Sequence, residues 1–97
     1  MHAHNHRVLV ENSITPMDWA VLSAGSYLLP MPPNQLVIQA QLESEDDFSS
    51  TELKTAAHNC LSHGWIIQKE EGIALTEEGR LFKERMSHEL METVELL

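Results

Sequence analysis

Apolar residues recur at intervals of three or four over much of this 97-residue chain, which indicates amphipathic helices. One helix is predicted to begin at Thr15, which can cap it, with Pro16 in the first helical position. We expect it to end only at the segment 30–33, because three prolines in four residues cannot continue a helix. A second helix is predicted from Asn34 to about Leu42. Its residues that we expect to turn inward are Leu36, Val37, Ala40 and, as a further candidate, Ile38.

A third helix is predicted over about residues 50–63. Ser49 and Glu52 have the spacing of a capping box, in which hydroxyl and carboxylate each accept a backbone N–H. Gly64 stands just beyond the helix, where a left-handed residue commonly ends one. We expect the inner face of this helix to consist of Leu53, Ala56, Ala57, Cys60 and Leu61. Its outer face is then left with polar residues.

Two short apolar runs follow, 65–67 and 73–75, and predict a β-hairpin. The residues between them, Glu70-Glu71-Gly72, fit a three-residue loop with Gly72 at positive φ. Thr76 then caps a last helix over about residues 77–97. Its apolar stripe extends beyond what one small domain needs, and an exposed stripe of that length would aggregate. We therefore expect contacts with a second copy of the chain through Met86, Leu90, Val94 and Leu97.

The length of the chain predicts one small domain over residues 14–97. Residues 1–13 are expected to be a tail or a short strand through Val8-Leu9-Val10. The one cysteine, Cys60, excludes an internal disulfide. No apolar run approaches the roughly 20 residues that span a bilayer, and the first residues lack the apolar core of a signal peptide. We therefore expect a cytoplasmic protein that does not enter a membrane.

The predicted order helix, helix, helix, hairpin, helix is mainly α with one small β-hairpin. It resembles the winged helix-turn-helix of MarR- and PadR-type bacterial transcriptional regulators. The resemblance rests on Ile14-Thr15-Pro16-Met17, on Ser50-Thr51, on Leu61 with Trp65-Ile66, and on Leu75-Thr76-Glu77-Glu78-Gly79-Arg80.

In proteins of this kind the third helix reads base edges and the wing contacts the DNA backbone. The resemblance therefore implies a transcriptional regulator that binds double-stranded DNA as a homodimer, with residues 50–63 as its recognition helix. Carried over by position, the residues that would contact DNA are Ser50, Thr51, Lys54, Thr55 and His58 on the helix and Lys69 on the wing.

The net charge opposes this interpretation. The chain has 15 Asp and Glu against 6 Lys and Arg, a formal net charge of −9, whereas phosphate binding requires cations. Residues 43–52 carry five acids and no Lys or Arg, but residues 53–76 balance two lysines against two glutamates. The local charge of a contact face can differ in this way from the net charge of the whole chain. The alternative is an acidic winged-helix module for protein–protein interaction, which binds a basic partner and not DNA.

Other chemistry has weaker support. His2, His4 and His6 alternate, so an extended tail would place their imidazoles on one side as possible ligands for copper, nickel or zinc. Ordering such a tail costs conformational entropy, and we assign no metal site. The sequence has no Gly-rich phosphate loop, no nucleophile motif and no Cys/His pair at a useful spacing. We therefore expect neither an enzyme nor a cofactor.

Overall fold

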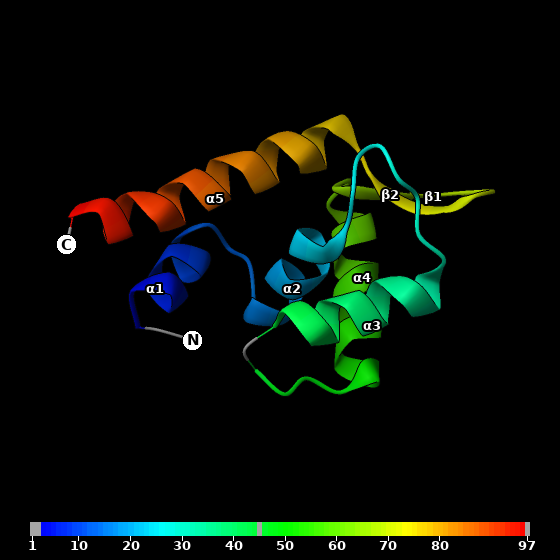
Figure 1. The fold of residues 1–97 in the computed structure, drawn as a ribbon, viewed down its shortest axis with the longest axis horizontal. Helices are drawn as coiled ribbons and strands as arrows, with labels where there is room; N and C mark the ends of the chain where they lie inside the picture. Colours follow the sequence, from blue (N-terminus) through cyan, green and yellow to red (C-terminus); the bar gives the residue numbers. More distant parts are fainter. Residues whose placement is uncertain (1–2, 45, 97) are drawn as a thin grey trace.

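The computed structural model describes the backbone of residues 3–44 and 46–96 and the side chains of residues 7–44 and 46–90. Within them the fold is mainly helical with one two-stranded antiparallel hairpin, as predicted. Figure 1 shows α1 at one end of the long axis and the hairpin at the other. The elements in chain order are α1 (Ala3–Glu11), α2 (Pro16–Ala24), α3 (Pro33–Glu43), α4 (Ser50–Ser62), β1 (Ile66–Lys69), β2 (Gly72–Leu75) and α5 (Glu77–Leu96).

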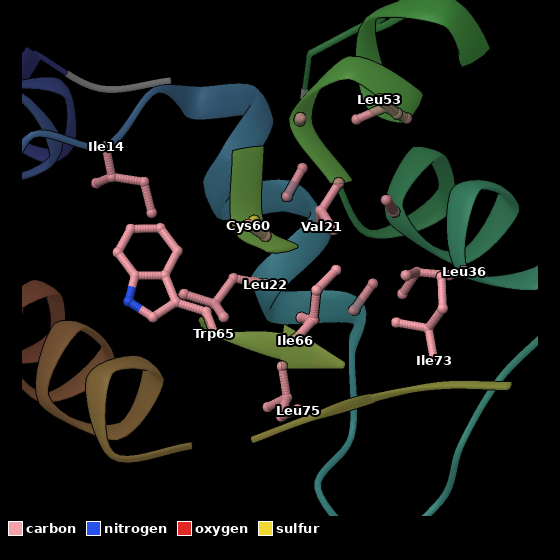
Figure 2. Packing of buried hydrophobic residues seen from close by; sticks show 14 of the residues in the cluster. Ile14, Val21, Leu22, Leu36, Leu53, Cys60, Trp65, Ile66, Ile73 and Leu75 are labelled. Atoms are coloured by element: carbon pink, nitrogen blue, oxygen red, sulfur yellow. The ribbon is translucent and has the colours of Figure 1, made fainter. Parts of the chain in front are cut away.

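The core is built around α2, which packs against α3 and α4 and also touches α1 and α5. Val21 and Leu22 of α2 are completely buried. Figure 2 shows them between residues of α3, α4 and the hairpin. Burying a side chain of this size contributes about 1.5–3 kcal/mol, so α2 is the element on which the packing of the others depends.

The N-terminal segment is helical, which corrects the expected tail or short strand. Leu9 of α1 is 1% exposed, within the same core. The helix ends where Ser13 adopts a φ of 59°, with the N–H of Ile14 donating to the carbonyl of Leu9 at 3.0 Å. A run as short as Val8-Leu9-Val10 fits a strand or a helix equally well, so only the packing of Leu9 decides between them.

Helix α2 begins as predicted but ends earlier. Thr15 and Asp18 form a complete capping box. The helix stops at Ala24 instead of continuing to the prolines, because Gly25 adopts an extended conformation. A Cβ at Gly25 would lie only 2.9 Å from the Cδ2 atom of Leu75, so the helix is in close contact with β2 at this point.

The segment after α2 runs along β2. The N–H of Leu75 donates to the carbonyl of Ser26 at 2.9 Å, and Met31 exchanges two backbone hydrogen bonds with Ile73. These bonds attach both ends of segment 26–31 to β2, and the chain bends between them, where the N–H of Leu29 donates to the Ser26 hydroxyl at 3.1 Å. Leu28 and Leu29, which a longer helix would have carried, are therefore 80% and 71% exposed.

Helix α3 begins one residue before and ends one residue after the predicted bounds. Leu36, Val37 and Ala40 are buried, as expected. Ile38 is 55% exposed, because a residue two positions after Leu36 lies on the opposite side of a helix.

Helix α4 follows the prediction closely, except in one hydrogen bond. The Ser49 hydroxyl accepts the N–H of Glu52 at 3.1 Å, but the Glu52 carboxylate accepts the Ser49 hydroxyl and not its N–H, so the capping box is half formed. At the other end Gly64 has a φ of +76°, and the N–H of Trp65 reaches the carbonyl of Cys60 at 3.0 Å. This is the predicted left-handed helix end.

The hairpin turns more tightly than predicted. Lys69 pairs directly with Gly72, so only Glu70 and Glu71 lie between the strands. Gly72 has the predicted positive φ, at +137°. The backbone of Met31 occupies the space that a Cβ at position 72 would need, so glycine is required here by contact as well as by conformation.

Helix α5 packs its first half onto the domain and touches α1, α2 and β2. Met86 is completely buried in the core of a single chain, which corrects its assignment to a dimer contact. Leu90 also packs partly against this core. The Val94 side chain and the whole of Leu97 lie outside the described residues.

Candidate nucleic-acid interface

The outer face of α4 consists of exposed polar side chains. All five residues of this helix that are predicted to contact DNA are exposed: Ser50, Thr51, Lys54, Thr55 and His58. The neighbouring Asn59 and Ser62 are exposed as well. Lys69 is exposed on the adjacent strand β1. The structure therefore brings the helix residues together on one face, with Lys69 on the hairpin that follows the helix. We call these six residues the α4–hairpin face.

Two hydroxyl groups on this side of α4 bond to the helix backbone. The Thr55 hydroxyl donates to the carbonyl of Thr51, and the Ser62 hydroxyl donates to that of His58, both at 3.1 Å. Because the proton of Thr55 is used within the helix, its oxygen can still accept a hydrogen bond from a ligand. The charged group on the outer face of α4 that remains available for phosphate is the ammonium of Lys54.

The cations of the chain differ in whether they have internal partners. Lys54 and Lys69 have no ion pair or side-chain hydrogen bond with any described residue, and neither has Arg7 on α1. Arg7 lies on α1, at the far end of the long axis from the hairpin (Figure 1). The available cations near the hairpin are therefore those of the α4–hairpin face.

The cations at the start of α5 are occupied. Arg80 pairs with Glu77 at 3.5 Å and Glu84 at 3.6 Å, and its guanidinium lies 5.3 Å from the centre of the Tyr27 ring. These contacts hold Arg80 against its own domain and neutralise it.

Lys83 closes the end of α2. Its ammonium donates to the carbonyls of Ser23 at 2.9 Å and Gly25 at 3.0 Å. Burial lowers the pKa of Lys83 from its usual value, and the charge of Glu43 acts in the opposite direction. An open depression of about 580 Å³ lies beside Lys83 and Arg80, but both cations are already occupied there.

A smaller cavity of about 230 Å³ opens between α3, α4 and the hairpin. Exposed polar residues from all three elements surround it: Asn34 of α3, Lys54 and His58 of α4, and Gln68 of β1. Buried apolar residues line it further in, among them Leu36 of α3 and Ile73 of β2, which Figure 2 shows side by side. Sequence reasoning missed Asn34 and Gln68, because only the packing of α3 and the hairpin against α4 brings them to Lys54.

Acidic residues border the same face. Glu70 and Glu71 are exposed at the tip of the hairpin, and Glu52 is exposed in the first turn of α4. The carboxylate of Glu52 accepts the Ser49 hydroxyl at 3.2 Å. The acids therefore lie at two edges of the α4–hairpin face, and the centre of the face carries Lys54 and His58.

Cys60, which lies behind the face, is unsuited to act as a nucleophile. Burial raises the pKa of the Cys60 thiol to about 12, and the charge of Asp18 adds to this effect. The thiol donates to the backbone carbonyl of Asp18 at 3.7 Å. A thiol with this pKa stays protonated near neutral pH and is a poor nucleophile.

The described residues contain no group of three or more His, Cys, Asp or Glu side chains that could hold a metal ion. The side chains of His2, His4 and His6 lie outside the described residues. The chain from Ala3 onwards is helical, so the alternation expected of an extended tail does not apply to it.

A stack of side chains joins the end of α4 to α5. The ring of Trp65 lies parallel to that of His63, with centres 4.3 Å apart, and to that of Phe82, with centres 4.5 Å apart. The guanidinium of Arg85 lies 5.1 Å from the centre of the Phe82 ring. Trp65 packs in the core at 9% exposure. The stack fixes the angle at which α5 leaves the hairpin.

Comparisons with family models, with characterised proteins and with solved structures find no match to this chain. No helix among the described residues combines the length and the apolar character needed to cross a membrane.

Proposed function

We propose that this protein is a transcriptional regulator that binds DNA through a winged helix, with α4 as the recognition helix and β1–β2 as the wing. The order α2, α3, α4, hairpin, α5 is that of the winged helix-turn-helix, and α1 is an addition at the N-terminus. A helix such as α4, with a polar outer face and 13 residues, is of a length suited to the major groove.

The observation that carries the proposal is the distribution of available cations. The two lysines of the α4–hairpin face have no partner among the described residues, whereas Arg80, Lys83 and Arg85 are engaged within the domain. The net charge of −9 therefore overstates the repulsion at this face. Long-range repulsion remains, so we expect modest affinity that depends on a specific sequence.

We also propose that the protein is a homodimer through the second half of α5. The helix has 20 residues and is therefore about 30 Å long, and among its described side chains Phe82, Met86 and Leu90 pack in or against the core. The sequence continues the apolar stripe beyond this point with Val94 and Leu97. A dimer doubles the number of lysines that meet DNA.

The test is a titration of labelled duplex DNA at two salt concentrations. Four phosphate contacts per dimer predict an affinity about a hundredfold weaker in 200 mM salt than in 50 mM salt. Either single charge reversal on the face, Lys54→Glu or Lys69→Glu, should weaken binding strongly, whereas Arg7→Glu, the same change away from the face, should leave most of it. Equal losses in all three variants would refute the assignment of the face.

A second function has one observation in its favour. Ile38 and Leu42 lie one turn apart on α3 and are 55% and 75% exposed, next to the acidic turn 43–47. An apolar pair beside carboxylates fits a basic amphipathic segment of another protein. Absence of any DNA binding in 50 mM salt would favour this interaction module over the regulator.

A further inference from the structure

The cavity between α3, α4 and the hairpin has the size of a small-molecule site. Its volume is about 230 Å³. A cavity of about 150 Å³ holds benzene, and sites for drug-sized ligands begin at about 300 Å³. The occupant that fits is therefore a molecule larger than benzene and smaller than a typical drug.

The inner surface of the cavity is aliphatic. Among the described residues that line it, none carries a phenyl, phenol or indole ring. Leu36, Val37 and Ile73 are buried, and Leu61 is half-buried. Such a surface contacts a flexible hydrocarbon chain well and has no aromatic partner against which a flat ring would stack.

The mouth of the cavity is cationic in a strongly acidic protein. The Lys54 ammonium has no partner among the described residues, and the imidazole of His58 can donate an N–H in either protonation state. Asn34, in the first turn of α3, lies at the same mouth, and that helix has no side-chain cap. These groups complement a carboxylate placed at the opening.

We propose that this cavity binds a medium-chain fatty acid of about six to eight carbons, with the hydrocarbon chain inside and the carboxylate on Lys54 and His58. The ligand class follows from the aliphatic lining, the volume and the charge at the mouth. Binding requires no DNA, so the proposal stands apart from the regulator function. If that function is correct, the ligand occupies Lys54 and competes with DNA.

The experiment measures binding of a series from butanoate to decanoate to the full chain without DNA, by calorimetry and by amide chemical shifts. Each methylene that enters the cavity should strengthen binding about fourfold, until the chain length exceeds the cavity. Octanol, which has the same chain length without the charge, should bind at least tenfold more weakly than octanoate. Shifts should concentrate at residues 33–37, 54–61 and 68–73.

Variants test separately the part of the cavity that holds the hydrocarbon chain and the part that holds the carboxylate. Leu61→Trp should abolish octanoate binding by filling the cavity, and Ala57→Leu provides a smaller filling change if the tryptophan variant does not fold. Lys54→Met should weaken octanoate binding about tenfold without changing octanol binding, and Lys69→Met should change neither. The proposal is overturned if octanoate does not saturate the protein at millimolar concentration, if both filling variants bind normally, or if octanol binds as tightly as octanoate.

Discussion

The carbonyl oxygen of Trp65 occupies the space that a Cβ at Gly79 would fill. The same carbonyl accepts the N–H of Thr76 at 2.9 Å, and the Thr76 hydroxyl accepts the N–H of Gly79 at 3.0 Å. The hydroxyl also donates to the carbonyl of Gly64. The segment Leu75-Thr76-Glu77-Glu78-Gly79 therefore holds the first turn of α5 against the residues that end α4, and a glycine at position 79 is what allows this close contact.

Gly79→Ala should destabilise the protein by about 2 kcal/mol, because the first turn of α5 must move away from Trp65. Alanine is the better helix former by about 1 kcal/mol, so without this contact the substitution would stabilise. Thermal unfolding should show a midpoint about 10 °C lower. Leu81→Ala, at a 52% exposed site in the same helix, is the control and should change stability by less than about 1 kcal/mol. A Gly79→Ala protein as stable as the wild type would disprove the close contact.

Lys83 and Lys54 should have opposite mutational effects. Lys83→Met leaves the carbonyls of Ser23 and Gly25 without their donor and should reduce the free energy of unfolding by about 1–2 kcal/mol. Lys54→Met removes no internal bond and should leave stability unchanged. DNA affinity should show the reverse: Lys54→Met should bind DNA more weakly than the wild type, and Lys83→Met should bind it as the wild type does. Denaturant titrations and DNA titrations on both proteins test this, and a loss of both properties in one variant would contradict the division.

The Cys60 thiol should couple stability to alkaline pH. Its pKa is raised to about 12 from an ordinary value of 9.0, so between these values the folded state holds the proton while the unfolded state loses it. The stabilisation is complete below pH 9 and is lost as the pH rises from 9 towards 12. Between pH 8 and pH 10.5, the free energy of unfolding measured with denaturant should decrease less in Cys60→Ala than in the wild type. Native protein at pH 8 should also resist iodoacetamide, and rapid labelling without unfolding would contradict the burial of the thiol.

Val94→Glu should convert the proposed dimer to a monomer, because it places a charge in the apolar stripe that the proposed dimer contact uses. Truncation before Met86 would not test the dimer, since it would remove a core residue. Sedimentation equilibrium should give the monomer mass for Val94→Glu and the dimer mass for Glu95→Lys, a charge change that the helical period places on the opposite side from the stripe. A wild-type protein that sediments as a monomer would refute the dimer.

The parts of the fold that the sequence predicts correctly are those set by local chemistry. Thr15 caps α2, Gly64 adopts its left-handed conformation, and the two apolar runs pair as the strands of the hairpin. Each depends on a few neighbouring residues, whose conformational preferences are strong.

The parts that the sequence did not predict depend on distant contacts. Helix α2 ends at Gly25, where β2 is in close contact through Leu75, and Leu9 belongs to a helix because a core exists for it to enter. Met86 fits the periodicity of a dimer stripe as well as that of an internal core. In the candidate site, the exposed face of α4 followed from its periodicity. The cavity beside it did not, because Asn34 and Gln68 reach it only through the packing of three elements.

The most direct test of the account is amide chemical-shift mapping of the isotopically labelled protein during titration with duplex DNA in low salt. The account predicts that the perturbed amides lie in residues 50–63 and 66–72, with little change in α1 and in residues 38–47. Perturbation centred on residues 38–47, or no perturbation at any residue, would show that the α4–hairpin face does not bind DNA.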